Sequence, residues 1–183
     1  MFALGALSAV AASTRPELLA PSVLAMLASE GLLDSVGVAA IDPDVSDTAA
    51  TRERYELPLD SLANCVIVGG RRDGVEKVAA VVVLANTRAD INSTVKRLLD
   101  VRKASFLPMD VAVEASGMEY GAITPVGLPA DWPIFIDLRV AESDLVVIGS
   151  GVRNSKILLP GRILALLPGA QIVEGLGRAV ADG

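Results

Sequence analysis

The strongest constraint on the fold is a pair of apolar segments separated by a short turn between glycines. Residues 63–69 and 75–85 are mostly apolar, and the segment between them, 70–74, reads Gly-Arg-Arg-Asp-Gly. This pattern is typical of two β-strands joined as an antiparallel hairpin. Because neither strand alternates strictly between apolar and polar residues, we expect both faces of the hairpin to be buried. The hairpin therefore predicts the centre of a sheet.

Helical and strand-like segments surround this hairpin without regular β-α-β alternation. The expected helices cover residues 14–31, 46–55, 90–101, 108–116 and 160–167, and the further strands cover 36–41, 134–138, 145–148, 156–159 and 172–173. Pro21 lies inside the first helical pattern and offers a later start, and Ser46 would cap the second helix. This order predicts an α+β fold in which helices flank a mixed, mainly antiparallel central sheet or partial barrel. A length of 183 residues fits a single domain over 1–183.

The composition excludes several kinds of active site. The chain has no histidine and one cysteine, Cys65, which rules out a Ser-His-Asp triad, a histidine-ligated metal and an internal disulfide. We therefore expect no metal. Cys65 lies within an apolar strand, which favours a buried and inert thiol. Hydrophobic residues make up 52% of the chain but aromatic residues only 3%, so the core must be aliphatic.

No segment has the length and hydropathy of a membrane span. The apolar stretch 1–12 lacks a basic beginning, and the longest apolar run covers only residues 78–85. A chain with a single cysteine suits a reducing compartment. We therefore expect a cytoplasmic protein without a membrane partner.

Basic residues gather in one part of an acidic chain. The net charge of −6 argues against a general nucleic-acid binder but leaves room for a local basic patch. The cluster consists of Lys96, Arg97, Arg102 and Lys103, with Arg88 nearby. On one helix, Lys96 and Lys103 would share a face. The cluster is either a solvated helix face or a patch that contacts phosphates.

A G-x-x-x-P segment lies in the densest loop, residues 117–133. It consists of Gly121, Ala122, Ile123, Thr124 and Pro125. Glycine can adopt positive φ and proline fixes φ, so the three amides between them could converge on a carbonyl oxygen or an oxyanion. With 16 glycines and 10 prolines in the chain, about one such segment is expected by chance. The pattern alone therefore also fits a structural turn.

A further glycine-containing segment, Gly149-Ser150-Gly151, follows an apolar strand and resembles half of a dinucleotide fingerprint. It lacks the third glycine, the following helix and the acidic partner of the complete motif, so we expect no nucleotide cofactor. The remaining interpretations are a tight strand exit or the wall of a pocket. Asp137 and Glu142 lie on either side of a turn, and the sequence does not decide whether they pair.

Several segments follow one another in a characteristic order: Ala63–Gly69, Val83–Ala85, Val101–Ala104, Gly117–Gly127, Ile134–Asp137, Val146–Gly151 and Leu158–Pro160. In this order, residues 36–175 resemble the YbaK family, the editing domain associated with prolyl-tRNA synthetase. The resemblance implies hydrolysis of the ester that joins a wrong amino acid to the 3′ adenosine of a tRNA. It also implies that the loop 121–125 binds the aminoacyl carbonyl through backbone amides and helps to position the attacking water.

The resemblance further implies where substrate would bind. The substrate-binding residues would be Asn64, Asp137, Gly149, Ser150 and Gly151, and the tRNA-binding residues would be Lys96, Arg97, Arg102 and Lys103. In the family pattern, Gly151 corresponds to the glycine beside the amino-acid pocket. An activated ester needs mainly positioning and oxyanion stabilisation, so the absence of histidine does not prevent this chemistry.

The chain departs from the family at one important position. The family usually carries a lysine early in the first hairpin strand, whereas Asn64 stands there in this sequence. Asparagine donates hydrogen bonds but has no charge to meet a phosphate. Either another cation substitutes, the substrate differs, or hydrolysis is lost. Lys77 and Lys103 are the two lysines that the predicted hairpin and the family pattern bring near this position.

The sequence thus predicts a trans-acting aminoacyl-tRNA deacylase for a small amino acid. Its partner would be tRNA, and further candidates are an aminoacyl-tRNA synthetase and a second copy of the chain in a dimer. The alternative is a non-catalytic module that binds aminoacyl-tRNA or a small ligand and has lost hydrolysis with the change at Asn64. A third interpretation is a dimeric scaffold without a ligand.

Overall fold

The computed structural model describes residues 2–179 of the chain. The strands are β1 (Phe2–Leu4), β2 (Leu7–Ala11), β3 (Gly37–Ala40), β4 (Ala63–Arg72), β5 (Val75–Leu84), β6 (Thr87–Ala89), β7 (Ala104–Phe106), β8 (Ile134–Asp137), β9 (Val146–Gly149), β10 (Ser155–Leu159), β11 (Ala170–Val173) and β12 (Gly177–Ala179). The α-helices are α1 (Pro21–Ser29), α2 (Thr48–Tyr55), α3 (Lys96–Leu99), α4 (Met109–Ser116) and α5 (Leu138–Ala141). A π-helical turn, Ile91–Val95, precedes α3, and the 3-10 helices are Ala12–Thr14, Pro16–Leu18, Pro43–Val45, Leu59–Ser61 and Gly161–Leu166.

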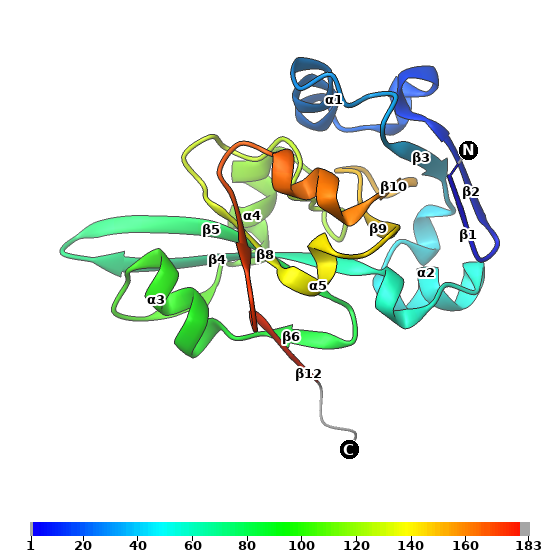
Figure 1. Cartoon of the computed structure of the whole chain (residues 1–183). Coiled ribbons are helices and arrows are strands. Elements are labelled where there is room, and N and C mark those ends of the chain that lie inside the picture. The colour runs from blue at the N-terminus through cyan, green and yellow to red at the C-terminus, as the bar shows by residue number, and fades with distance from the viewer. Residues whose placement is uncertain (1, 180–183) are drawn as a thin grey trace.

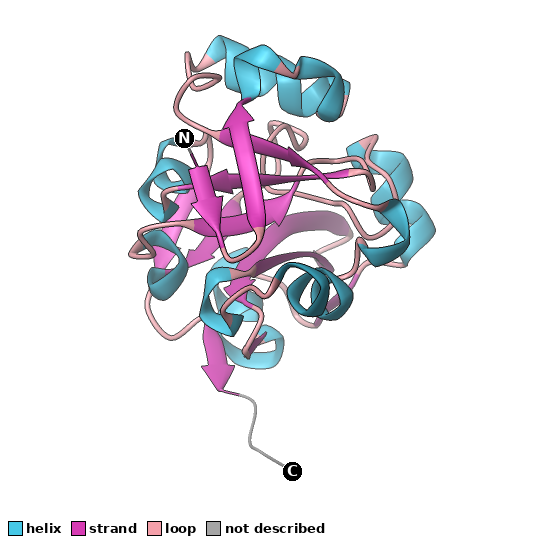
Figure 2. Ribbon diagram, turned by 90° about the vertical axis from the view of Figure 1, so that its right-hand side faces the viewer, coloured by secondary structure: helices cyan, strands magenta, loops and turns pink. Residues whose placement is uncertain are grey.

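Two five-stranded sheets form the centre of the molecule, and the helices lie outside them (Figures 1 and 2). The first sheet has the order β1-β2-β3-β10-β9 and is antiparallel throughout. The second has the order β11-β8-β5-β4-β7, and in it β8 runs parallel to both β5 and β11. A bridge between Leu62 and Val147 joins the start of β4 to β9. The predicted α+β fold with a mixed, mainly antiparallel sheet and flanking helices is confirmed.

The apolar hairpin has the central place that its sequence predicts. Strands β4 and β5 pair antiparallel over ten residues each, and β5 lies between β4 and β8 (Figure 1). The connecting turn is shorter than predicted, because the strands continue to Arg72 and restart at Val75. Asp73 and Gly74 both have positive φ, 52° and 83°, which matches the right-handed twist of the paired strands.

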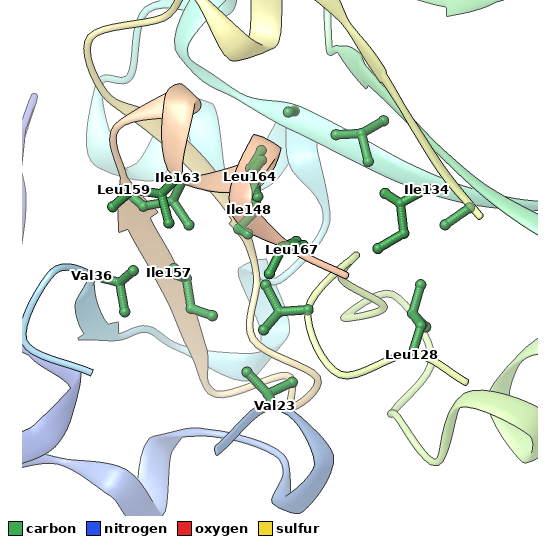
Figure 3. Close-up of a cluster of buried hydrophobic side chains, with 14 of the residues drawn as sticks. Val23, Val36, Leu128, Ile134, Ile148, Ile157, Leu159, Ile163, Leu164 and Leu167 are labelled. Atoms are coloured by element: carbon green, nitrogen blue, oxygen red, sulfur yellow. The ribbon is translucent and has the colours of Figure 1, made fainter. Parts of the chain in front are cut away.

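The main core is aliphatic, as the composition requires. Ile148 of β9 and Ile157 of β10 are direct cross-strand partners, and both are buried. Val23 of α1 and Leu164 of the 3-10 helix Gly161–Leu166 belong to the same cluster (Figure 3). The cluster therefore ties the N-terminal helix and the C-terminal part of the chain to the two strands that form one wall of the cavity described below.

The N-terminal region differs from its prediction. Residues 2–11 form the β1–β2 hairpin, and the predicted helix over 14–31 begins only at Pro21 after two 3-10 turns. Proline disfavours helical backbone in the residue before it, and Ala20 accordingly has an extended ψ of 149°. The helix ends before Gly31, which has a φ of +67°. The cap of α2 is Asp47 rather than Ser46, since the Asp47 carboxylate accepts from the Ala50 amide at 2.9 Å.

The predicted helix over 90–101 is also shorter than expected. Asp90 caps its first turn, but α3 ends at Leu99 because Asp100 adopts the left-handed conformation with a φ of 53°. Lys103 therefore lies outside the helix and does not share a face with Lys96. Among the helices of residues 2–179, none is both long and apolar enough to cross a membrane.

Candidate active site

A cavity of about 360 Å³ lies where β4 meets β9 and β10. Its walls come from both sheets, from the start of α2 and from the segment between β7 and α4. Most of its lining is apolar. The lining residues are Asp47, Thr48, Leu62, Ala63, Asn64, Cys65, Val66, Ile67, Phe106, Leu107, Met109, Ala112, Gly121, Ile123, Val147, Ile148, Gly149 and Lys156. The cavity therefore joins the strand that carries Asn64 to the G-x-x-x-P loop, as the family resemblance implies.

The start of α2 orients Asn64. The Thr48 hydroxyl donates to the Asn64 side-chain oxygen at 2.6 Å. Within residues 2–179, the Asn64 side-chain nitrogen has no hydrogen-bond partner, so it remains a donor for a ligand. The site thus holds a neutral donor at the position for which the family resemblance implies a lysine.

Backbone geometry explains how the G-x-x-x-P loop is held. Gly121 has a φ of +75°, which L side chains rarely adopt. The Ala122 amide donates to the Glu119 carbonyl at 3.0 Å, and the Ala122 carbonyl accepts from the Gly151 amide at 2.9 Å. Ala122 therefore holds the loop through hydrogen bonds to Glu119 and to Gly151, and Gly121 and Ile123 line the cavity.

The three amides of the loop are not equally available to a ligand. The Ala122 amide is occupied, and the Thr124 amide makes a weak hydrogen bond to the Met118 sulfur at 3.4 Å. In the part of the chain that the structure describes, the Ile123 amide donates to no protein acceptor. Of the three amides that were expected to converge, only the Ile123 amide is thus free to donate to a ligand, because the amides of Ala122 and Thr124 make hydrogen bonds within the turn.

Gly149, Ser150 and Gly151 have different surroundings. A Cβ at Gly149 would lie 2.5 Å from the Ala122 carbonyl oxygen, so only glycine lets the loop pack on β9. Ser150 is fully buried, and its hydroxyl hydrogen-bonds to Ser155. Gly151 faces Ala20 rather than the cavity. Of Gly149, Ser150 and Gly151, which were all expected to bind substrate, Gly149 alone lines the cavity, and the other two hold the strand exit.

Asp137 lies outside the set of residues that line the cavity, in contrast to its expected role. Its carboxylate pairs with Arg139 at 2.8 Å and accepts from the Gly177 amide at 2.6 Å. These hydrogen bonds lower the pKa of Asp137, although burial works in the opposite direction. Asp137 therefore anchors β12 to the end of β8.

The basic cluster also lies away from the cavity lining. Lys96 and Arg97 are exposed on α3, and Arg102 pairs with Asp73 of the β4–β5 turn at 3.1 Å. Lys77 pairs with Asp100 at 3.3 Å. Neither Lys77 nor Lys103, the two lysines expected to compensate for Asn64, is among the lining residues.

The structure adds a residue that the sequence analysis missed. Lys156 of β10 lines the cavity and is only 7% exposed, and its Nζ donates to the Ser46 carbonyl at 2.6 Å. Burial lowers its pKa to about 8, and Arg153 acts in the same direction while Asp47 opposes the shift. The signal in the sequence is a single lysine inside the otherwise buried strand Ser155–Leu159.

Cys65 also faces the cavity but lacks the chemistry of a nucleophile. Desolvation raises the pKa of its thiol to about 12. The nucleophile of cysteine is the thiolate, which is scarce at neutral pH under these conditions. This environment agrees with the expectation of an inert thiol, but Cys65 is half-buried rather than buried, because it lines the cavity.

The fold and the cavity together define a class of protein: a small α+β domain whose two sheets meet over an apolar cavity with a few polar donors. The model of the aminoacyl-tRNA editing domain matches residues 42–166, and the chain belongs to this family. The resemblance to the YbaK family is thereby confirmed. A search of curated proteins gave no match.

Solved structures share the fold at low sequence identity. A protein proposed to be a trans-editing enzyme for prolyl tRNA synthetase matches with a TM-score of 0.72 and 18% identity, covering 88% of this chain and 99% of its own. The hypothetical protein APE2540 matches with a TM-score of 0.74 and 22% identity, covering 86% and 99%. A scaffold used for epitope backbone grafting matches with a TM-score of 0.73 and 18% identity, covering 87% and 97%. At these identities, the likenesses establish the fold.

Proposed function

We propose that the chain is a trans-acting aminoacyl-tRNA deacylase that removes a small amino acid from a mischarged tRNA. The observation that carries the proposal is that Asn64 and the Gly121–Pro125 loop line one cavity in a member of the editing-domain family. A cavity of about 360 Å³ is at the small end of ligand sites, which suits a small side chain and part of the terminal ribose.

The reaction is hydrolysis of an ester. The oxygen of a water molecule bonds to the aminoacyl carbonyl carbon, and the bond from that carbon to the ribose 3′ oxygen breaks. The proton lost by water ends on the ribose oxygen, so the products are the free amino acid and tRNA with its terminal hydroxyl. We assign to the Ile123 amide, which has no acceptor within residues 2–179 and belongs to a residue that lines the cavity, the donation to the carbonyl oxygen as it gains negative charge. The substrate's own 2′-hydroxyl can assist, as the family resemblance implies.

A groove beside the cavity offers a path for the acceptor end of tRNA. It has a volume of about 840 Å³ and shares Asn64, Val66 and Phe106 with the cavity. Arg88 and Arg178 line it, and Phe106 is 61% exposed. Cations beside an exposed aromatic ring suit a phosphate and a stacked base. The basic cluster on and after α3 is the second place at which we propose contact with tRNA.

The cellular setting follows from the substrate. A structural relative proposed to edit in trans for prolyl tRNA synthetase supports tRNA as the partner and a synthetase as the source of the mischarged substrate. We accordingly place the protein in the cytoplasm, in the control of translation fidelity.

The decisive experiment is single-turnover hydrolysis of a panel of mischarged tRNAs by the wild-type chain and by Gly121→Val. We expect hydrolysis of one or two small-amino-acid esters, and loss of it in the variant, because valine disfavours a φ of +75° and reaches the Arg153 side chain. Gly74→Val is the matched control: its φ is +83°, but nothing lies within 4 Å of its added Cβ. Full activity in Gly121→Val would remove the loop from the mechanism.

The neutral side chain at position 64 also favours a second candidate, a binding module that no longer hydrolyses its ligand. In that case the wild-type chain would bind a non-hydrolysable aminoacyl-adenosine analogue and leave every mischarged tRNA intact. Asn64→Lys would then create deacylation. No gain of activity in this variant would contradict the second candidate.

A further inference from the structure

Lys156 brings a positive charge into the cavity from the first sheet, whereas Asn64 enters it from the second. The side chain belongs to a strand whose five residues are all buried. A charged group in such a place normally has a partner of opposite charge or acquires one from a ligand. The surroundings of its ammonium group therefore indicate whether the charge serves the fold or the site.

The ammonium group is incompletely paired. One of its three N–H donors is used by the Ser46 carbonyl. Within residues 2–179, no carboxylate oxygen lies within 4.0 Å of the Lys156 ammonium nitrogen, and Asp47, the acidic residue whose charge acts on the lysine, uses its carboxylate to cap α2. Donors remain for a ligand that presents an oxygen with negative charge.

The strand register places Lys156 next to the G-x-x-x-P loop. Lys156 is the direct cross-strand partner of Gly149. Directly opposed residues project on the same face of a sheet, and the loop backbone packs against that face at Gly149. The lysine side chain therefore leaves the sheet on the same face as the loop backbone, which fills the space beside Gly149. Both Ile123 and Lys156 line the resulting cavity.

We propose, on the basis of the deacylase function above, that Lys156 is the cation of this active site and replaces from β10 the lysine that the family carries at position 64. Its ammonium group donates to the oxygen of the aminoacyl ester that gains charge when water attacks. Lys156 thereby completes, with the Ile123 amide, a pair of donors around one oxygen. With a pKa of about 8, the side chain is still mainly charged at neutral pH.

The test moves the lysine from one strand to the other. Lys156→Met keeps the length of the side chain and removes its charge, and Asn64→Lys in the same chain restores a lysine at the family's position. Lys77→Met is the matched control, because Lys77 is paired with Asp100 outside the cavity. The wild type and the three variants are compared in single-turnover deacylation of the substrate that the wild type prefers, and their thermal unfolding is recorded.

The expected result is a loss of about 100-fold in Lys156→Met, the usual effect of removing one donor from an oxyanion site. The double variant should recover at least a tenth of the wild-type rate, and Lys77→Met should match the wild type. If Lys156 were merely structural, Lys156→Met would have a lower unfolding temperature than the wild type, and adding Asn64→Lys would restore no activity.

Two other outcomes overturn the proposal and differ from each other. Deacylation at the wild-type rate in Lys156→Met would show that Lys156 takes no part, while the deacylase function would stand. If the wild-type chain itself hydrolyses no mischarged tRNA, the deacylase function fails and the role of Lys156 fails with it.

Discussion

At the scale of single residues, the buried charge of Lys156 affects the free energy of unfolding as well as the cavity. Its folded pKa of about 8 lies below the usual 10.5 of an unfolded chain. Below pH 8 both states are protonated, and the folded state bears the full penalty of a buried charge. Between pH 8 and pH 10.5 the folded state loses its proton first, so this lysine's contribution makes the protein more stable as pH rises. The total change is about 3 kcal/mol, from the shift in pKa.

Lys156→Met should therefore be more stable than the wild type at pH 7, and the difference should shrink as pH approaches 10.5. Loss of the hydrogen bond to Ser46 offsets about 1 kcal/mol of the gain. Urea unfolding of both proteins at a series of pH values measures the difference in stability. The raised pKa of Cys65 makes both proteins less stable at high pH by the same amount, so its contribution cancels in that difference. A wild type that is the more stable protein at pH 7 would contradict this account of the buried charge.

Cys65 should react slowly in the native protein. A thiol pKa of about 12 leaves roughly one molecule in 10⁴ as thiolate at pH 8. Alkylation by iodoacetamide should accordingly be far slower in the folded chain than in guanidinium, as mass spectrometry can follow. Cys65→Ala should deacylate at a rate near that of the wild type. Rapid native labelling, or loss of activity in the variant, would restore the thiol as a candidate nucleophile.

At the scale of elements, β9 supports the G-x-x-x-P loop through Gly149. In Gly149→Ala, the new methyl group would meet the Ala122 carbonyl oxygen at 2.5 Å, so the loop must move away from the strand. We expect a loss of about 1–3 kcal/mol in the free energy of unfolding, the usual effect of overpacking, together with reduced deacylation. Gly74→Ala at the exposed turn should leave deacylation unchanged. Unchanged activity in Gly149→Ala would mean that the loop does not need this contact.

The elements that the sequence predicts well carry their own local signals. The β4–β5 hairpin has a long apolar pattern and a turn that favours positive φ, and α4 begins after Pro108 and ends before Gly117. By contrast, β6, β7 and β12 have three residues each, too few for a hydrophobic period. Their positions depend on pairing partners far away in the chain. The helix α3 is likewise short because Asp100 adopts the left-handed conformation. An aspartate at this position does not by itself predict that the helix ends there.

The same distinction applies to the candidate site. Gly121 and Asn64 could be found from family order, and both line the cavity. The pairing of Asp137 was not predicted, because its hydrogen bond from the Gly177 amide joins residues that only the tertiary fold brings together. Lys156 was missed for a related reason: strand pairing with Gly149, rather than neighbours in sequence, brings it to the loop.

At the scale of the whole molecule, an acidic protein must bind an acidic substrate. The net charge of −6 repels tRNA at long range, so attraction must come from a few local cations. Arg88 is the stronger candidate in the groove beside the cavity, because it makes no ion pair with residues 2–179, whereas Arg178 pairs with Asp90 at 2.7 Å. Arg102 is likewise a weaker candidate for contact with a phosphate, because it pairs with Asp73.

Arg88→Glu should therefore weaken tRNA binding more than Arg102→Glu does. Loss of one phosphate contact reduces the slope of log affinity against log salt by about one unit, because one fewer counterion is released. Filter binding of tRNA to the wild type and both variants over a range of salt concentrations measures affinity and slope together. A larger effect of Arg102→Glu would move the tRNA contact to the basic cluster near the β4–β5 turn. Equal affinities in all three proteins would exclude both surfaces as points of phosphate contact, and the acceptor end would then have to enter the cavity from another side.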